Sequence, residues 1–336
     1  MSFLIKETII YSIPLLIVAL AGVFAERSGV VNLALEGTMI FGAFSGVLLI
    51  YIIQENNLTD KEHSQLLLIL AMFFSALGGS FFSLLLSFAA INLKVHQTIA
   101  GTALNMLSPA LVLFLSGAVT SQGILSMTEG DAANWFMLKR SDFGFDETEV
   151  LNFFENTFLV KNYITTYICI FLYVILSVIL YKTRFGLRLR SCGENPHASD
   201  SLGIDVNKMR YAGTTLSGAL SGIGGFVFTL TTANATASGD VAGFGFLSLA
   251  VMIFGNWNPL YISGTAFLFG LFKCIAASYA TIDINGDGIY ALAQLGINKN
   301  FYRMLPYLIT LLVLAFTSKH SRAPKAEGIP YDKSKR

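Results

Sequence analysis

Nine apolar stretches, separated by polar segments, run along the chain. They cover residues 8–25, 33–53, 66–91, 97–118, 162–181, 211–230, 244–255, 260–280 and 301–318. At about 1.5 Å per residue, a helix needs at least ~17 apolar residues to cross the hydrocarbon core of a bilayer. Only the seventh stretch is shorter, so we expect a tilted, broken or re-entrant element there. The pattern predicts an all-α fold, a polytopic membrane bundle of about nine transmembrane helices.

Charge divides the polar segments into two kinds. Residues 121–161 form a long acidic loop, whereas lysine and arginine dominate residues 182–210 and 319–336. Basic segments beside membrane helices stay on the cytoplasmic side. Counting helices between these segments places the N-terminus outside and the C-terminus inside, with the acidic loop extracellular. We therefore predict one transmembrane domain, residues 1–318, followed by a basic cytoplasmic tail.

The composition agrees with a membrane protein and excludes several other classes. Of 336 residues, 54% are hydrophobic and 13% are charged, against about one quarter charged in soluble domains. A net charge of +1 gives no electrostatic reason to bind nucleic acid. The three cysteines and four histidines lack metal-ligand spacing, so we expect no metal and no cofactor. Without a nucleophile–base constellation or a G-x-x-x-x-G-K-[ST] motif, we predict no catalytic residues and no ATP binding by this chain.

A short capped helix is predicted inside the basic segment 182–210. Asn195 can cap its N-terminus, Pro196 suits the first helical position, and Gly203 can end it. Ala198 and Leu202, four residues apart, would supply its apolar contact. A membrane protein that presents such a helix to the cytoplasm can dock it on a partner. The alternative is that the helix only closes the loop.

Two polar residues lie near the start of the second stretch. Asn32 can cap the predicted helix by accepting from its first amides. Glu36 falls one turn into the helix, where a carboxylate is costly unless it faces protein or a wet cavity. Both are candidate pathway residues, although a water-reachable helix start would also explain Glu36. Lys273 lies about 10 Å deep in the eighth stretch, and we expect its ammonium group to snorkel to the interface.

A polar stripe is predicted on the fourth helix. Thr98, Gly101, Thr102 and Asn105 follow three- and four-residue steps, which bring them to one helix face. Thr98, Thr102 and Asn105 are therefore candidate residues of a solute pathway. Alternatively, the small residues let helices approach and Asn105 makes an interhelical hydrogen bond.

Glycines form two further surfaces, for which packing is the favoured interpretation. Small residues let membrane helices approach closely, and a smooth face has little means of recognising a solute. The positions are Gly42 and Gly46 on the second helix, and Gly218, Gly222 and Gly225 on the sixth.

Several of these segments resemble one family of membrane proteins. Residues 186–206 (GLRLRSCGENPHASDSLGIDV), 26–37 (ERSGVVNLALEG), 97–105 (QTIAGTALN) and the basic tail resemble ABC importer permeases of the ribose, branched-chain amino acid and nucleoside type. The match is strongest to the bacterial nucleoside subgroup. The long acidic loop is a departure from the family pattern.

The resemblance implies a function and a set of partners. We expect a multi-pass protein of the bacterial plasma membrane that forms the pathway for nucleosides by ATP-driven alternating access. The implied partners are an ABC ATPase that receives the helix at Asn195–Gly203, a second permease, and an extracellular solute-binding lipoprotein. A permease for a simple sugar such as ribose, and an ion-coupled secondary transporter with Glu36 and Lys273 as relay groups, remain alternatives. The sequence does not identify the solute.

Overall fold

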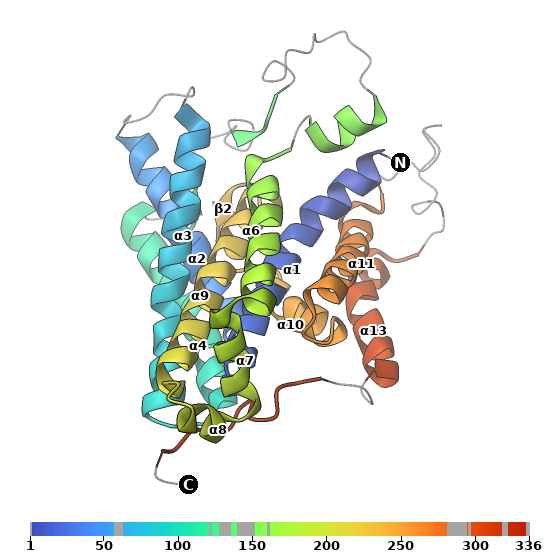
Figure 1. The fold of residues 1–336 in the computed structure, drawn as a ribbon. Coiled ribbons are helices and arrows are strands. Elements are labelled where there is room, and N and C mark those ends of the chain that lie inside the picture. Colours follow the sequence, from blue (N-terminus) through green and yellow to red (C-terminus); the bar gives the residue numbers. More distant parts are fainter. Residues whose placement is uncertain are drawn as a thin grey trace.

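The computed structural model describes residues 2–56, 63–120, 123–127, 136–139, 152–159, 162–280, 294, 297–317 and 322–333. The described part is a bundle of helices (Figure 1). In chain order its helices are α1 (Ser2–Arg27), α2 (Leu35–Glu55), α3 (Ser64–Ser87) continued by a π-helical turn η2 (Phe88–Asn92), α4 (Gln97–Thr120), a second π-helical turn η4 (Glu155–Leu159), α6 (Ile164–Lys182), α7 (Arg184–Glu194), α8 (Pro196–Ser201), α9 (Val206–Thr231), α10 (Phe244–Phe254), α11 (Pro259–Ser278) and α13 (Lys299–Thr317).

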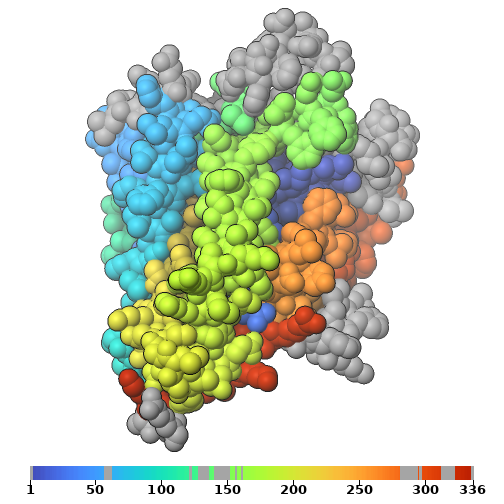
Figure 2. All heavy atoms as spheres, in the orientation of Figure 1, coloured from blue at the N-terminus to red at the C-terminus, as the bar shows by residue number. Residues whose placement is uncertain are grey.

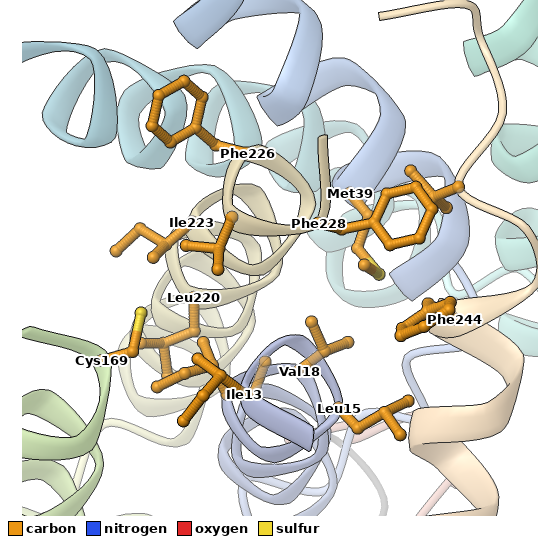
Figure 3. Packing of buried hydrophobic residues seen from close by; sticks show 14 of the residues in the cluster. Ile13, Leu15, Val18, Met39, Cys169, Leu220, Ile223, Phe226, Phe228 and Phe244 are labelled. Carbon is orange, nitrogen blue, oxygen red and sulfur yellow. The ribbon is translucent and has the colours of Figure 1, made fainter. Parts of the chain in front are cut away.

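Helices α1 and α9 form the centre of the bundle. In each of them most of the apolar segment is buried inside the protein, whereas only about a quarter of the apolar segment is buried in α4, α6 and α11. In the space-filling view α1 shows only as a strip between α6 and α11 (Figure 2). Hydrophobic side chains of α1, α2, α6, α9 and α10 meet in one core (Figure 3), where the Phe228 and Phe244 ring centroids are 4.7 Å apart. Exposed apolar helix faces suit lipid or further subunits.

Close approach of α9 to α2 and α3 depends on glycine. A Cβ built on Gly42 would lie 2.2 Å from the Cα of Gly222, and one on Gly225 would lie 2.0 Å from the carbonyl oxygen of Met39. Likewise, a Cβ on Gly218 would lie 2.2 Å from the Ser83 hydroxyl. Gly46 meets the Phe226 ring in the same way. The structure thus places all five predicted packing glycines at helix–helix contacts.

The two ends of the bundle differ. The N-terminus and η4 lie at one end, and α7 and α8 at the other (Figure 1). Two short strands, β1 (Leu125–Ser126) and β2 (Thr236–Ala237), pair antiparallel with Leu125 opposite Ala237. This ladder joins the segment after α4 to the segment after α9.

The all-α membrane fold predicted from the sequence is confirmed, since seven described helices are long and apolar enough to cross a bilayer. Two of the nine predicted crossings, α10 and α13, are not among these seven. At 11 residues, α10 is about 16 Å long, roughly half of the hydrocarbon core. The structure also contains α7, a helix where the sequence interpretation placed only loop. Most of the acidic segment 121–161 lies outside the described residues.

Candidate functional site

The connection between α1 and α2, residues 28–34, is a non-helical segment packed inside the bundle, which we call the elbow. Ser28, Val30, Asn32 and Ala34 are fully buried. Buried backbone amides and carbonyls without helical partners are costly, so other groups must bind them. The elbow is therefore held by side chains from distant parts of the chain.

Helix α4 supplies most of these side chains. The Val31 amide donates to Gln97 Oε1 (2.7 Å), and Asn105 Nδ2 donates to the Leu33 carbonyl (2.7 Å). Asn105 Oδ1 in turn accepts from the Gly37 amide at 2.8 Å, so it binds one of the free amides at the start of α2. Asn105 thus joins the elbow to the start of α2 through these two hydrogen bonds, as an interhelical clamp.

Asn32 holds the elbow from within. Its Nδ2 donates to the Ser217 hydroxyl on α9 (2.8 Å), and its Oδ1 accepts from the Ala34 amide (3.0 Å). The residue at the N-cap position of α2 is Ala34, which has no capping side chain. The prediction that Asn32 caps α2 was therefore wrong, because the free amide of Gly37 is bound by a side chain from another helix.

The Glu36 carboxylate caps a different helix from its own. Its Oε1 accepts from the Gly243 amide (3.0 Å), and its Oε2 accepts from the amides of Gly245 (2.7 Å) and Phe246 (3.2 Å). These amides lie at the N-terminus of α10, where the helix dipole and free N–H groups favour an anion. A Cβ on Gly245 would lie 2.5 Å from the Glu36 backbone, so only glycine permits this contact. The buried carboxylate is fully bonded by protein.

The opposite end of α10 is bound by a second carboxylate. Trp257 Nε1 donates to Glu26 Oε2 at 2.5 Å, and the Tyr181 hydroxyl donates to the Trp257 carbonyl at 2.6 Å. Glu26 precedes the elbow and Glu36 follows it, so both ends of α10 are bonded to the flanks of the same segment. We call the elbow and α10 together the elbow–α10 unit.

Lys273 of α11 also contacts the start of α10. Its ammonium group donates to the Ala242 carbonyl (3.1 Å) and lies 4.7 Å from the centroid of the Phe244 ring. It lies 5.6 Å from the Tyr307 ring of α13, which adds a second cation–π contact. That the Lys273 ammonium group snorkels to the interface stays a prediction, and the structure adds these protein contacts to it.

The predicted polar stripe on α4 is divided between two environments. Asn105 and Gly101 face the elbow, whereas Thr98 and Thr102 are exposed. The Thr102 hydroxyl donates to the Thr98 carbonyl of its own helix at 3.0 Å. Within this chain, the two threonines therefore do not share a site with Asn105. They lie on an α4 face that a pathway or a second subunit can border.

Helices α7 and α8 form the end of the bundle near the elbow. The Thr183 hydroxyl caps α7 by accepting from Gly186, and Asn195 Oδ1 caps α8 by accepting from the Ala198 amide at 3.1 Å. Pro196 is the first residue of α8, and Gly203 has a φ of +79°, as expected for a residue that ends a helix. Ala198 and Leu202 face outward, and Leu202 is 81% exposed. An apolar side chain this exposed suits a partner surface.

Helix α7 packs against the end of α1. A Cβ on Gly193 would lie 2.4 Å from the Arg27 carbonyl oxygen, and Arg27 pairs with Glu194 at 3.4 Å. Burial raises the pKa of the nearby Cys192 thiol. A continuous chain of contacts therefore leads from the exposed helix α8 through α7 and the end of α1, which precedes the elbow, to α10.

Sequence reasoning missed Glu26, Gln97 and Trp257. Glu26 and Trp257 lie in polar segments between apolar stretches, where charged and aromatic residues are common at interfaces. Their partnership joins residues 231 positions apart, which no local pattern reveals. In the described part of the chain, no cluster of His, Cys, Asp or Glu could hold a metal ion.

Comparison with known proteins gives one consistent result. Residues 4–314 match the family described as "Branched-chain amino acid transport system / permease component". The chain is 36% identical to the nucleoside ABC transporter permease protein NupC of Lactococcus lactis, covering all of this chain and 98% of that protein. It is 35% identical to the guanosine ABC transporter permease protein NupQ of Bacillus subtilis, again over all of this chain and 98% of that one. NupB of Lactococcus lactis, also a nucleoside ABC transporter permease protein, is 24% identical over 96% of this chain and 85% of that protein. No solved structure matches the chain.

Proposed function

Because the chain belongs to the branched-chain amino acid transport system permease family, we propose that it is a transmembrane permease subunit of a bacterial ABC importer for nucleosides. The family makes it a transporter component, which supports a role other than that of an enzyme. The structural observation that supports this function is the chain of contacts from exposed α8 to α10. It offers a route by which a cytoplasmic ATPase can move a buried half-length helix, as alternating access requires.

The proposed partners are an ABC ATPase, a second permease and an extracellular solute-binding lipoprotein. Leu202 and Ala198 of α8 would contact the ATPase, which would bind and hydrolyse ATP. This chain resembles two nucleoside permeases of one organism, NupC and NupB, which supports pairing with an unlike permease. The exposed faces of α4, α6 and α11 would meet that permease or lipid.

The solute is tested by uptake into cells with and without the gene. We propose a nucleoside because the named relatives at 35–36% identity are nucleoside and guanosine permeases. Deletion should abolish uptake of radiolabelled guanosine or adenosine and leave ribose and leucine uptake unchanged. Loss of ribose uptake alone would favour the sugar alternative and contradict the nucleoside assignment.

An ion-coupled secondary transporter has less support. In such a protein Glu36 and Lys273 would exchange protons or ions, yet Glu36 binds three backbone amides and Lys273 a carbonyl. Co-purification of an ATPase with the tagged permease, and uptake into vesicles that requires ATP, would favour the importer. Uptake driven by an ion gradient in the absence of any ATPase would contradict it.

The proposed orientation places α7, α8 and the C-terminal tail in the cytoplasm, with the N-terminus outside. Since the native Cys192 is fully buried, Leu202→Cys is a better reporter. In cells that produce the permease without its ATPase, a membrane-impermeant thiol reagent should label Leu202→Cys in opened vesicles and not in intact cells. The unaltered protein, whose cysteines are all buried, serves as the control. Labelling of Leu202→Cys in intact cells would contradict this orientation.

A further inference from the structure

The described part of the C-terminal tail crosses the α7–α8 end of the bundle (Figure 1). It has no regular secondary structure, but Pro324, Ala326 and Tyr331 are buried. A polar tail that only ended the chain would not bury these side chains. We call residues 322–332 the strap.

Backbone hydrogen bonds attach the strap to elements far apart in the sequence. The Arg322 amide donates to Asn256 Oδ1 (2.7 Å), next to the end of α10, and the Ala326 amide donates to the Gly193 carbonyl of α7 (2.8 Å). The Gly328 amide donates to the Gly29 carbonyl of the elbow (3.3 Å). The strap therefore bonds to both parts of the elbow–α10 unit and to α7.

Two charged groups hold the middle of the strap. Arg210 of α9, which is 1% exposed, donates from Nη1 to the Ile329 carbonyl at 3.0 Å. The Glu327 side chain hydrogen-bonds that of Glu26, and burial raises the pKa of Glu327 to about 7. The carboxylate that binds Trp257 at the end of α10 is thus also bonded to the strap.

The last residues of the strap contact α8 itself. Tyr331 is buried beside Cys192 and Val206, and its ring centroid lies 5.3 Å from that of His197 on α8. Asp332 pairs with Lys94, between η2 and α4, at 3.1 Å. Helix α8 is only six residues long, and it buries Pro196 and Ser199 but exposes Ala198. A helix this short has little contact area to fix its position, and Tyr331 adds to the contacts of α8.

We propose that the strap is a positioning segment, in which Tyr331 fixes α8 relative to the elbow–α10 unit so that movement of α8 reaches α10. This inference rests on the proposed importer function. A strap with this role transmits force between elements and contacts no solute. Loosening it should therefore uncouple ATP hydrolysis from transport before it prevents assembly.

The test uses the full-length chain purified with its second permease and ATPase and reconstituted in liposomes. Tyr331→Ala should leave ATPase co-purification and basal hydrolysis unchanged. Guanosine uptake per ATP hydrolysed should fall about fivefold or more, the lower end of typical coupling between sites. Tyr331→Phe, which keeps the ring against His197, should restore the ratio.

Two further variants complete the design. Ile329→Ala is the matched control, because this side chain is 56% exposed and the hydrogen bonds of the residue, to Arg210 and to Ala326, come from its backbone, so the ratio should stay normal. If Tyr331→Ala fails to insert, Asp332→Ala removes the surface ion pair to Lys94 and should lower the ratio roughly twofold, within the range for exposed pairs. A normal ratio in Tyr331→Ala, or in Asp332→Ala where the first variant is lost, would overturn the proposal. Loss of ATPase binding in Tyr331→Ala would also overturn it, because the strap would then be a docking surface. If no ATPase co-purifies with the unaltered chain, the importer function itself fails.

Discussion

Replacing Glu36 by alanine is expected to abolish nucleoside uptake while the protein still inserts into the membrane. The carboxylate accepts from three amides at the start of α10. The buried amide of Gly245 left without a partner costs about 1–3 kcal/mol, and the part-buried amides of Gly243 and Phe246 lose their acceptor as well unless the helix start moves. The N-terminal turn of α10 should therefore shift or unwind, which disconnects it from the elbow. Radiolabelled guanosine uptake and thermal unfolding of the purified complex measure the two effects.

The matched control for this change lies on the same helix. Glu55 ends α2 and is exposed, so Glu55→Ala removes an equal charge without freeing a buried amide. Its uptake and melting temperature should stay close to those of the unaltered protein. Glu36→Gln keeps one accepting oxygen but turns an NH₂ group toward N–H donors, so it should retain little activity. Normal uptake by Glu36→Ala would show that the carboxylate does not hold α10 in place.

The sequence predicted most of the fold because membrane insertion leaves a strong local signal. Apolar stretches long enough to cross the bilayer form helices, because in lipid the backbone must satisfy its own hydrogen bonds. The charge of each connecting segment indicates on which side of the membrane it lies. The stretch that forms α10 could be identified as an unusual element from its short length alone. Helix α7 was missed because its Arg-rich sequence has no apolar run of membrane length, although Thr183 provides a capping residue.

The site was only partly predictable, for a different physical reason. Capping of α8 by Asn195 depends on neighbours three residues apart, so the sequence sufficed to anticipate it. Glu36 was identifiable as a costly charge in a membrane helix, but its partner is the start of a helix more than 200 residues away. Glu26 and Trp257 are likewise more than 200 residues apart in the sequence. Such pairings arise only when the whole chain folds, and a single sequence does not reveal them.

The second large effect is expected from Leu202→Glu. Leu202 is 81% exposed at the end of α8, so the change should not disturb this chain. If the side chain enters an apolar pocket of the ATPase, the leucine contributes about 1.5–3 kcal/mol of burial, and an unpaired carboxylate in its place costs more than that contribution. ATPase co-purification, uptake and solute-stimulated hydrolysis should all be lost, while the amount of permease in the membrane stays unchanged.

Two control variants separate a docking effect from an effect of charge alone. Leu202→Met keeps the apolar volume and should retain most uptake, since such exchanges usually cost less than about 1.5 kcal/mol in packed environments. Asn207→Glu adds the same carboxylate at an exposed position in the first turn of α9, where the helix dipole favours a negative charge. It should leave uptake intact. If Leu202→Glu transports normally, or if Asn207→Glu fails as completely, α8 does not dock through its leucine, and the route from α8 to the elbow–α10 unit loses its starting point.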